Sequence, residues 1–533
     1  MDNITADYVV VGGGLTGCVV ASRLRQRNGQ PSVILLEAGL DPSGNPAAAG
    51  LLGGLSLQGG ELDYAYQSDP EPNTVNRVHT LNAGKVLGGG SILNYGGWLR
   101  ADAADYNDWA EIVADHRWSY QGLKPWFRKT ERYADPQADP DERGFDGAMH
   151  ISPISASESG ERKYPLREHT KRAWLELGVP ENTRRKNGST RGLAEMVENS
   201  HKGMRQPAQA SYPLDGVQIL LQTLVQRVTF SGSVATGVEL ADGCIISARK
   251  EVILCAGAYR TPQLLMLSGI GPRGLLSELG IAVRHDSPYV GQNLHDHFAI
   301  YLAFRLRDST AGYAMGSSLW NPGLCKTLPW DWVVSEPLPA ELMSKHGIKA
   351  EQERNLWEAI TLYVPPGIPG IPIDGSHIAT STMLLRPTSR GKVSIRSNSI
   401  SDPPRIEPNY LSTALDRDTL VHATRETLKA LSTGAMRPII ESETPPSGPG
   451  LDGLTPLTAD APDETIEERI RRTGMQHHHS GGTAAMGRVV DTEGNVIGVH
   501  QLRIADASII PIPLGGHPQA SLYAMAEQID SFI

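Results

Sequence analysis

The sequence predicts an α/β protein in which a Rossmann-like domain is interrupted by an inserted α+β part on a large, mostly antiparallel sheet. Two observations support this fold class. A strand, a glycine-rich turn, a helix and a second strand follow one another within the first 37 residues, and the composition changes between residues 306 and 473. At 533 residues the chain is too long for one hydrophobic core, so we expect two domains whose segments are interleaved along the chain.

The opening unit has the order of elements found in dinucleotide-binding folds. The apolar run 7–11 predicts a buried strand, and Gly12–Gly17 follows it directly with the spacing GxGxxG. We expect a helix from Cys18 to Gln26 and a second strand from Ser32 to Leu36. The alternative is a glycine-rich turn in another α/β unit. The complete order of strand, turn, helix, strand and acidic residue favours the dinucleotide site.

The glycines of this turn have separate roles in such a site. Gly12 allows the tight turn, Gly14 lets the backbone approach a pyrophosphate, and Gly17 lets the helix pack on the strand. The helix N-terminus then faces the phosphates. Glu37 follows Gly17 by about 20 residues, the offset at which a carboxylate usually binds a ribose hydroxyl.

Composition excludes several classes of function. The 49 basic and 59 acidic residues give a formal net charge of −10, and no basic cluster is present, which argues against a nucleic-acid partner. No run reaches the roughly 18 to 20 apolar residues of a membrane span. The first strand begins too near Met1 for a secretion signal, so we expect a cytoplasmic protein. From the charge balance we expect its substrate to be a small, uncharged molecule.

Cysteines and clustered histidines predict neither disulfides nor a metal site. The run His477–His479 has no carboxylate or cysteine at ligand spacing, so we expect no bound metal. Its first two members complete a strand or line the mouth of a pocket, with direct substrate contact as the alternative. The four cysteines are widely spaced, and we expect none to be paired: Cys18, Cys244, Cys255 and Cys325.

Three further segments complete the elements that the sequence predicts. The glycine-rich stretch 84–101 indicates a loop whose backbone passes close to a ring or an anion. Residues Lys250–Cys255 predict a buried strand, followed by a helix with Thr261 as N-cap and Pro262 at its first position. Between 306 and 473, where no nucleotide signal occurs, the alternating segment 391–396 predicts an antiparallel strand in a large sheet with one solvent-exposed face.

Five blocks stand out along the chain. They are Gly12–Gly17 with Glu37, Gly84–Asn94 with Trp98, Gly257–Pro272, Val290–His297, and the segment from His479 to Gln519. In this order and spacing they resemble the glucose-methanol-choline oxidoreductases, two-domain flavoproteins that bind FAD, and the resemblance extends from about Asp7 to the C-terminus. The last block contains His479–Gly487, similar to the HxxGTxxMG pattern of the family, and Gly515–Gln519 with a second histidine.

The resemblance implies an active site and a cofactor. His479 and His517 fall where the family keeps its catalytic pair, and FAD accepts a hydride from an alcohol carbon while the protein supplies the base. We assign His479 as the base and His517 as the partner that stabilises the developing alkoxide, although the roles can be exchanged. Some members attach FAD through a histidine in the second block, but Leu93 stands at that position, so we expect a noncovalent flavin.

The resemblance also implies domain limits and cofactor contacts. Asp506 is expected to contact the cofactor, but Asp-Ala-Ser is also a sequence that caps helices or turns, and a capping role alone is the alternative. A FAD-binding domain would comprise 1–155, 200–305 and 474–533, and a substrate-binding domain 156–199 and 306–473. The expected FAD contacts are Gly12, Gly14, Leu15, Thr16, Gly17, Glu37, Ala38, Leu87, Gly89, Gly90, Asn94, Val228, Ala256, Asp506, Ala507, His517 and Gln519.

The leading hypothesis is an FAD-dependent alcohol oxidase or dehydrogenase, reoxidised by O2 or a quinone-like acceptor. A hydroxynitrile lyase, which splits cyanohydrins by acid–base chemistry, is the rival within the family, and a flavin carrier without catalysis is a third interpretation. Tryptophans and a hydrophobic, proline-rich segment favour an aromatic or aliphatic alcohol, in secondary metabolism. Formate oxidation also stays open, and it would require an arginine near the flavin. The sequence indicates no oligomeric state.

Overall fold

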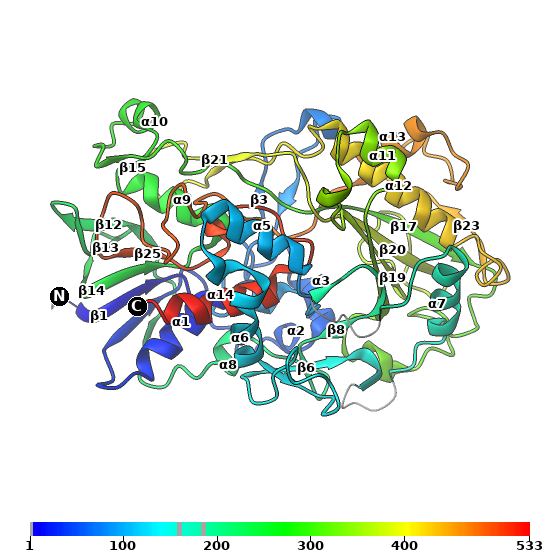
Figure 1. The fold of residues 1–533 in the computed structure, drawn as a ribbon, viewed down its shortest axis with the longest axis horizontal. Coiled ribbons are helices and arrows are strands. Elements are labelled where there is room, and N and C mark those ends of the chain that lie inside the picture. The colour runs from blue at the N-terminus through cyan, green and yellow to red at the C-terminus, as the bar shows by residue number, and fades with distance from the viewer. Residues whose placement is uncertain (1–3, 157–161, 183–187) are drawn as a thin grey trace.

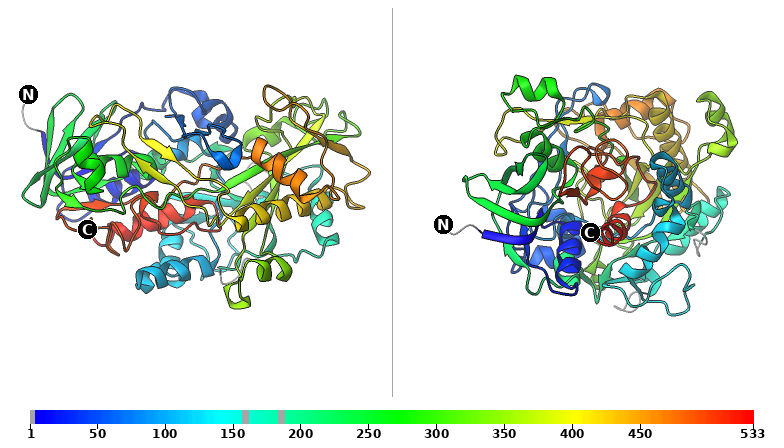
Figure 2. Two further views of the ribbon diagram at one scale, coloured as in Figure 1. Left: turned by 90° about the horizontal axis from the view of Figure 1, so that it is seen from above. Right: turned by 60° about the vertical axis from the view of Figure 1, so that its left-hand side comes forward.

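The computed structural model describes residues 4–156, 162–182 and 188–533, and two seven-stranded sheets dominate them. The sheets lie toward opposite ends of the longest axis of the molecule (Figure 1). The view from above shows the same separation (Figure 2). This arrangement confirms the predicted fold class, a Rossmann-like unit combined with a mainly antiparallel part, whereas the predicted domain limits stay a prediction.

The first sheet contains the predicted nucleotide unit. β1 (Ile4–Val11) lies between β2 (Val33–Leu36) and β14 (Ile245–Leu254) and runs parallel to both. α1 (Leu15–Arg25) begins three residues earlier than expected, because Gly14 already occupies the N-cap position. The remaining strands of this sheet are β11 (Gln218–Leu220), β12 (Val225–Ser231), β13 (Val234–Leu240) and β25 (Leu502–Ile504).

The second sheet is antiparallel and forms one wall of the site described below. Its order is β23-β17-β20-β19-β18-β7, and β24 also pairs with β17. The bounds are β7 (Gly192–Glu195), β17 (Phe298–Leu306), β18 (Trp330–Glu336), β19 (Trp357–Leu362), β20 (His377–Leu384), β23 (Ile440–Thr444) and β24 (Met475–Gln476).

The prediction that one face of this sheet is exposed to solvent is wrong. Every residue of β19 and β20 is buried: α12 (Ala414–Ala430) packs against both strands on one face, and Glu358 and Ser381 on the opposite face contact His517 and His477. The alternating segment 391–396 lies elsewhere: β21 (Lys392–Ser394) pairs with β22 (Arg405–Glu407) in a two-stranded ribbon. Alternation therefore identified a real strand but assigned it to the wrong sheet.

The helix after β14 also begins earlier than the sequence predicts. α9 spans Gly257–Leu267, so Thr261 and Pro262 lie inside the helix and not at its start. The Asp506 carboxylate accepts the Gly257 N–H and takes over the capping role. A proline inside a helix leaves one carbonyl without its N–H partner. Here Ala258 O accepts a hydrogen bond from Thr483 Oγ1 at 2.6 Å, which replaces that partner.

Other helices and short strands surround the two sheets. α14 (Pro518–Asp530), the last helix, contacts both α1 and α6 (Tyr120–Thr130) between the sheets. Further helices are α2 (Pro46–Ala49), α3 (Gly54–Leu57), α4 (Gly90–Leu93), α5 (Ala103–Val113), α7 (Arg167–Glu176), α8 (Ala208–Ser211), α10 (Arg273–Glu278), α11 (Ala340–Lys345) and α13 (Asp463–Thr473). Short strands are β3 (Tyr66–Gln67), β4 (Thr80–Leu81), β5 (Glu131–Tyr133), β6 (Met149–Pro153), β8 (Val197–Glu198), β9 (Ser200–His201), β10 (Met204–Arg205), β15 (Ile270–Gly271) and β16 (His285–Asp286).

Candidate active site

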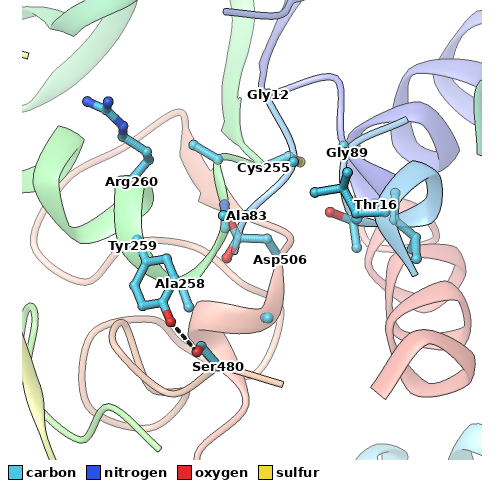
Figure 3. A pocket seen from close by; sticks show the side chains of 18 of the residues that line it. Gly12, Thr16, Ala83, Gly89, Cys255, Ala258, Tyr259, Arg260, Ser480 and Asp506 are labelled. Carbon is cyan, nitrogen blue, oxygen red and sulfur yellow. Dashed lines mark hydrogen bonds between the residues drawn. The ribbon is translucent and has the colours of Figure 1, made fainter. Parts of the chain in front are cut away.

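One cavity connects the glycine-rich turn after β1 with the two histidine loops near the C-terminus. Figure 3 shows part of its wall, where Gly12, Thr16, Gly89 and Asp506 come from segments far apart in sequence. The structure thus brings most of the predicted site residues together. Those that line the cavity are Gly12, Gly14, Leu15, Thr16, Glu37, Ala38, Gly89, Gly90, Asn94, Ala256, His479, Asp506, Ala507, His517 and Gln519.

Gly17, Leu87 and Val228 were predicted to contact the cofactor, but they do not line this cavity. A Cβ on Gly17 would lie 2.0 Å from Gly12 O, so this glycine serves the packing of the helix on the turn. The Leu87 side chain lies behind the turn, against Gly13. The Val228 N–H donates to Ser268 Oγ at 2.8 Å. The wall expected near Val228 is formed by the segment just before it, namely Thr223, Leu224 and Val225.

The backbone of the turn fits a pyrophosphate. A Cβ on Gly14 would meet only Cys255 O, at 4.0 Å, and a Cβ on Gly90 would meet no atom within 4 Å, so both backbones are open toward the cavity. No side chain in the described part of the chain forms a capping hydrogen bond at the N-terminus of α1. Free amides at a helix N-terminus, with no Cβ in the way, are the usual binding site of an anionic diphosphate.

Glu37 fits the ribose of the same nucleotide. Its Oε2 accepts the Gly13 N–H and its Oε1 accepts the Gly39 N–H, both at 2.8 Å. Each carboxylate oxygen still has acceptor capacity for a hydroxyl group. Burial raises the pKa of Glu37 to about 7, against the opposing effect of these hydrogen bonds. The residues of this end of the cavity therefore fit a dinucleotide.

Asp506 has the capping role that its sequence context allowed. Its Oδ1 accepts hydrogen bonds from Ser508 N at 2.9 Å and Ser508 Oγ at 2.6 Å. Its Oδ2 accepts from Gly257 N at 2.9 Å and Thr261 Oγ1 at 2.6 Å. One buried carboxylate thus joins the loop at 506–508 to the start of α9, while the residue also lines the cavity.

Asn94 and Gln519 are linked at the cavity wall. Asn94 Nδ2 donates to Gln519 Oε1 at 3.1 Å, and Gln519 Nε2 donates to Gly97 O. Asn94 Oδ1 accepts from Arg205 Nη1 at 2.8 Å. The Arg205 guanidinium otherwise donates to backbone carbonyls, and burial lowers its pKa to about 10. These contacts fix the orientation of both amides beside the space between nucleotide turn and histidines.

His479 and His517 face each other at the other end of the cavity. Their ring centroids lie 5.2 Å apart. His479 lies in the loop after β24, and its backbone N–H donates to Asp296 Oδ1 at 2.7 Å. His517 is the N-cap residue of α14. Two segments that are distant in sequence thus meet as a histidine pair, as the two motifs predicted.

A third histidine determines the tautomer of His479. His297 Nε2 lies 3.0 Å from Leu514 O, and a carbonyl can only accept, so His297 Nε2 carries the hydrogen. Burial lowers the pKa of His297 to about 3, so the ring is neutral and its Nδ1 is an acceptor. His479 Nδ1 lies 2.8 Å from this atom and must donate to it. The Nε2 atom of His479 is then an unprotonated acceptor, without a hydrogen-bond partner among the described residues.

The antiparallel sheet contributes a carboxylate to His517. Glu358 lies on β19, and its Oε1 accepts a hydrogen bond from His517 Nε2 at 2.8 Å. Glu358 pairs in register with Met383, and Ser381 pairs with Tyr301, so these four side chains lie on the same face of the sheet. With Nε2–H directed to Glu358, the Nδ1 edge of His517 lies next to Gly97 at the cavity wall.

Sequence reasoning did not identify His297 or Glu358 as functional. His297 belongs to the block Val290–His297, so its motif was visible, but its role depends on a contact with a loop 182 residues away. Glu358 is the one charged residue of the strand Trp357–Leu362. A charged residue among mainly apolar neighbours was the feature of the sequence that could have indicated this role.

His477 and His478 both line the cavity and follow the end of β24, so they do not complete that strand. His478 has a left-handed backbone with φ of 62°, and its Nδ1 lies 2.8 Å from Gln476 Nε2.

In the described ranges, no group of three or more histidine, cysteine or acidic side chains has a geometry that would hold a metal ion. Across the same ranges, no helix is both long and apolar enough to span a membrane.

Comparison with known proteins identifies the family. The family model described as GMC oxidoreductase matches residues 6–299, and the corresponding C-terminal model matches residues 387–526. The GMC-type oxidoreductase acuG of Aspergillus aculeatus is 36% identical, with 98% of each chain covered. An oxygen-dependent choline dehydrogenase of Pseudomonas fluorescens is 31% identical, with 98% of this chain and 92% of that protein covered.

Solved structures show the same fold over the whole chain. A variant of formate oxidase from Aspergillus oryzae superimposes with a TM-score of 0.89 at 27% identity, covering 100% of this chain and 98% of that one. Pyridoxine 4-oxidase from Mesorbium loti gives a TM-score of 0.85 at 26% identity, covering 99% and 98%. The chain therefore belongs to the glucose-methanol-choline (GMC) oxidoreductase family and is an FAD-dependent oxidoreductase that acts on CH–OH donors.

Proposed function

We propose that this protein oxidises an uncharged alcohol to a carbonyl compound, with His479 as the base and His517 as its partner. Bound FAD supplies the hydride acceptor, and O2 or another acceptor reoxidises it. The observation that carries the proposal is the contact between His297 and His479, because it leaves His479 Nε2 as an unprotonated acceptor at the cavity. Of the two histidines, His479 therefore has the atom that a base requires.

His517 supports the same reaction from the opposite side of the alcohol oxygen. Its ring orientation is fixed by Glu358, and its Nδ1 edge remains available at the wall beside Gly97. In our proposal, His479 Nε2 takes the hydroxyl proton while His517, carrying a hydrogen on Nδ1 as well as on Nε2, donates from Nδ1 to the oxygen as negative charge develops on it. The Glu358 carboxylate compensates positive charge on the His517 ring.

Two features favour a neutral alcohol over formate. Formate oxidation would require an arginine near the flavin, where the histidine pair also lies, and Arg260 is the arginine among the described residues that line the cavity. Its guanidinium lies over the rings of Tyr64 and Tyr66, at 4.9 and 5.5 Å. Figure 3 shows that it points away from Ser480, the residue after His479. Arg205 lies behind Asn94 and does not line the cavity.

We also propose that FAD is bound without a covalent link, because Leu93 lines the cavity where some family members carry the linking histidine. Glu37 and the open backbones of Gly14 and Gly90 would hold its adenosine diphosphate part. The wall formed by Asn94 and Gln519 would lie near the flavin end.

The test is anaerobic reduction of the flavin by alcohols in the wild-type protein and in a His479→Ala, His517→Ala double variant. We expect bleaching of the wild-type flavin by at least one alcohol, and a rate at least about 1,000-fold lower in the double variant, since base and oxygen stabilisation are both lost. An unchanged rate in the double variant would refute the assigned roles. Cleavage of mandelonitrile without any alcohol-dependent bleaching would instead support a lyase.

A further inference from the structure

A second cavity lies outside the candidate active site and shares none of its lining residues. Its volume is about 270 Å³, close to the lower limit of about 300 Å³ for small-molecule sites. Its wall combines α11 and the residues after it, the start of α12, the segment 386–390 after β20, and two residues before α14. Much of this wall is aliphatic, with Leu338, Met343, Ile348, Leu356 and Leu415.

Arg386 lines this cavity with one edge of its guanidinium free. Its Nη1 donates to the carboxylates of Asp105 and Asp108. Its Nε and Nη2 have no acceptor among the described residues, and neither is among their buried, unpaired polar atoms, so both reach solvent. The side chain as a whole is 16% exposed, and the cavity is an open space beside it. A ligand in this cavity can therefore accept from Arg386.

Arg390 lines the same cavity and also has a free N–H group. Its Nε donates to Asn293 Oδ1 at 2.9 Å, and its Nη1 donates to the carbonyls of Pro387 and Ser389. These contacts hold the side chain in place and leave Nη2 without an acceptor in the described part of the chain. This nitrogen is likewise accessible to solvent, since it is absent from the buried, unpaired atoms there. Two guanidiniums thus offer free donors to one space.

The other charged residues of the cavity are already paired. Arg354 forms a bidentate ion pair with Asp108, through contacts of 2.7 and 3.1 Å. Glu353, the acid of the described lining, pairs with the exposed Arg191 at 2.7 Å. The charge that still lacks a partner at this cavity is therefore positive, and it belongs to Arg386 and Arg390.

The two guanidiniums repel each other. Burial lowers the pKa of Arg390, the Asp416 carboxylate opposes this effect, and the positive charge of Arg386 adds to it. The oxygens of Asp416 accept hydrogen bonds from the backbone N–H and hydroxyl of Thr388 and from the Ser389 N–H. An anion bound to both arginines would remove their repulsion and would accept from the free N–H groups.

The chemistry of the wall indicates which anion fits. The Nε and Nη2 edge of an arginine matches the two oxygens of a carboxylate, which accept two parallel hydrogen bonds. The aliphatic part of the wall suits an apolar chain, because it removes that chain from water. A sugar phosphate would need further polar partners, and beyond the charged residues the described lining offers the side chains of Thr388 and Gln352. The site therefore fits a small monocarboxylate with an apolar chain.

The same cavity touches the segment that carries part of the candidate active site. Ile512 and Pro513 line it. The next residue is Leu514, whose carbonyl accepts from His297 Nε2 at 3.0 Å, and His517 follows three residues later at the wall of the first cavity. One short segment, 512–517, thus connects the second cavity with the histidine pair.

Asp105 provides a second connection to this segment. Its Oδ1 accepts from Arg386, and its Oδ2 accepts the Gly515 N–H at 2.8 Å. Asp105 is only 1% exposed, so water competes little for these contacts. A ligand that holds Arg386 in place therefore also restrains the turn between Leu514 and His517.

We propose that the second cavity is a regulatory site, which binds a small monocarboxylate with an apolar chain through Arg386 and Arg390. The bound carboxylate restrains the segment 512–517 and so accelerates flavin reduction at the histidine pair, because preorganised groups react faster. Binding at this site is independent of the proposed function, whereas the effect on the rate rests on it.

The first experiment measures binding to the oxidised wild-type holoenzyme. Hexanoate and hexanamide, which have the same chain and differ in charge, are titrated by isothermal calorimetry. We expect hexanoate to bind at least about tenfold more tightly, because only the carboxylate forms charge-assisted hydrogen bonds with the arginines. Equal affinities, or no binding of hexanoate, would overturn the inference.

Leu415 offers a matched pair of variants that locates the bound hexanoate. Leu415→Glu places a carboxylate in the wall, where it repels the ligand and competes for the arginines, and Leu415→Gln has the same size without the charge. We expect Leu415→Glu to weaken hexanoate binding at least about tenfold more than Leu415→Gln does. Equal affinities in the two variants, both with full flavin content, would place hexanoate elsewhere and overturn the inference.

Variants of Arg390 test its charge directly. Arg390→Met should weaken hexanoate binding about tenfold, and Arg390→Lys, which keeps the charge, should recover part of the affinity. Arg273→Met is the control, because Arg273 pairs with Asp286 and lines neither cavity. Wild-type affinity in Arg390→Met, or the same loss in Arg273→Met, would contradict a site at Arg390.

The effect on the reaction is measured by anaerobic flavin reduction at saturating alcohol, with and without saturating hexanoate. We expect the rate of the wild-type protein to rise about twofold or more, and that of Leu415→Glu to stay unchanged. An unchanged wild-type rate would overturn the regulatory role. Inhibition that more alcohol relieves would place hexanoate at the histidine pair and overturn the inference. If no alcohol reduces the flavin, the proposed function fails, and the binding results still decide whether the site exists.

Discussion

The Nδ1 atoms of His297 and His479 lie 2.8 Å apart, which is possible only if one ring donates and the other accepts. The Leu514 carbonyl requires His297 to donate through Nε2, so the neutral ring accepts through Nδ1. His479 consequently keeps its hydrogen on Nδ1 and leaves Nε2 free. A residue that does not line the cavity thereby determines which nitrogen of the base is available to substrate.

Replacing His297 tests this relationship. His297→Phe removes the acceptor, and we expect flavin reduction to slow about 10- to 100-fold, because His479 no longer favours the tautomer with a free Nε2. His297→Asn places an amide oxygen near the Nδ1 position and should recover most of the rate. The measurement is anaerobic stopped-flow reduction by a good alcohol substrate. Equal rates in the two variants, both with full flavin content, would contradict a tautomeric role.

The pH dependence of the same reaction should reflect the burial of His479. Burial and four neighbouring histidines lower its pKa well below the ordinary value, about 6.5 for a free imidazole. A base must be neutral to accept a proton, so activity falls only where the pH approaches this lowered pKa. We therefore expect kcat/KM for the alcohol to stay level from pH 8 down to below 6.5. An acidic limb centred at or above 6.5 would contradict His479 as a buried base.

Glu358→Gln tests the charge beside His517. The amide can keep a hydrogen bond to Nε2 but removes the negative charge, so stabilisation of positive charge on the ring is lost. A charge-assisted hydrogen bond contributes roughly 1.5–3 kcal/mol and a neutral one roughly 0.5–1.5 kcal/mol, so the difference of about 1–1.5 kcal/mol corresponds to a fall of about 5- to 10-fold in the rate of flavin reduction. Met383→Leu is the control, since Met383 pairs with Glu358 across the sheet and carries no charge. A similar fall in both variants would indicate a packing effect.

Retention of FAD should depend on pH through Glu37. Burial raises the pKa of this carboxyl to about 7, so it is mainly protonated at pH 6 and mainly ionised at pH 8. A ribose hydroxyl that donates a hydrogen bond binds the ionised form more strongly. We expect the Kd for FAD, measured by fluorescence, to fall as the pH rises from 6 to 8. Glu37→Gln should flatten this dependence and weaken binding at pH 8.

Acid precipitation tests the noncovalent flavin. Leu93 has no nucleophilic atom that could link to the flavin, so trichloroacetic acid should release all of the yellow colour into the supernatant. Absorbance of supernatant and pellet gives the result directly. A pellet that remained yellow after washing would show a covalent link through another residue and would refute the prediction.

The sequence by itself determined the nucleotide unit and the histidine pair. The GxGxxG turn, α1, β2 and Glu37 follow from local rules, because each depends on neighbours within a few tens of residues. His479 and His517 were identified because each lies in a recognisable motif. Local rules were wrong at the start of α9, where a cap came from Asp506, and for the sheet assignment of 391–396.

Only the tertiary structure decided how these residues are tuned. The contact of His297 with His479 spans 182 residues of sequence, and that of Glu358 with His517 spans 159. The burial of His477 and Trp330 likewise depends on how the antiparallel sheet packs against the rest of the chain. Sequence patterns record covalent neighbours, whereas tautomers, desolvation and unpaired polar atoms depend on the groups that folding brings together.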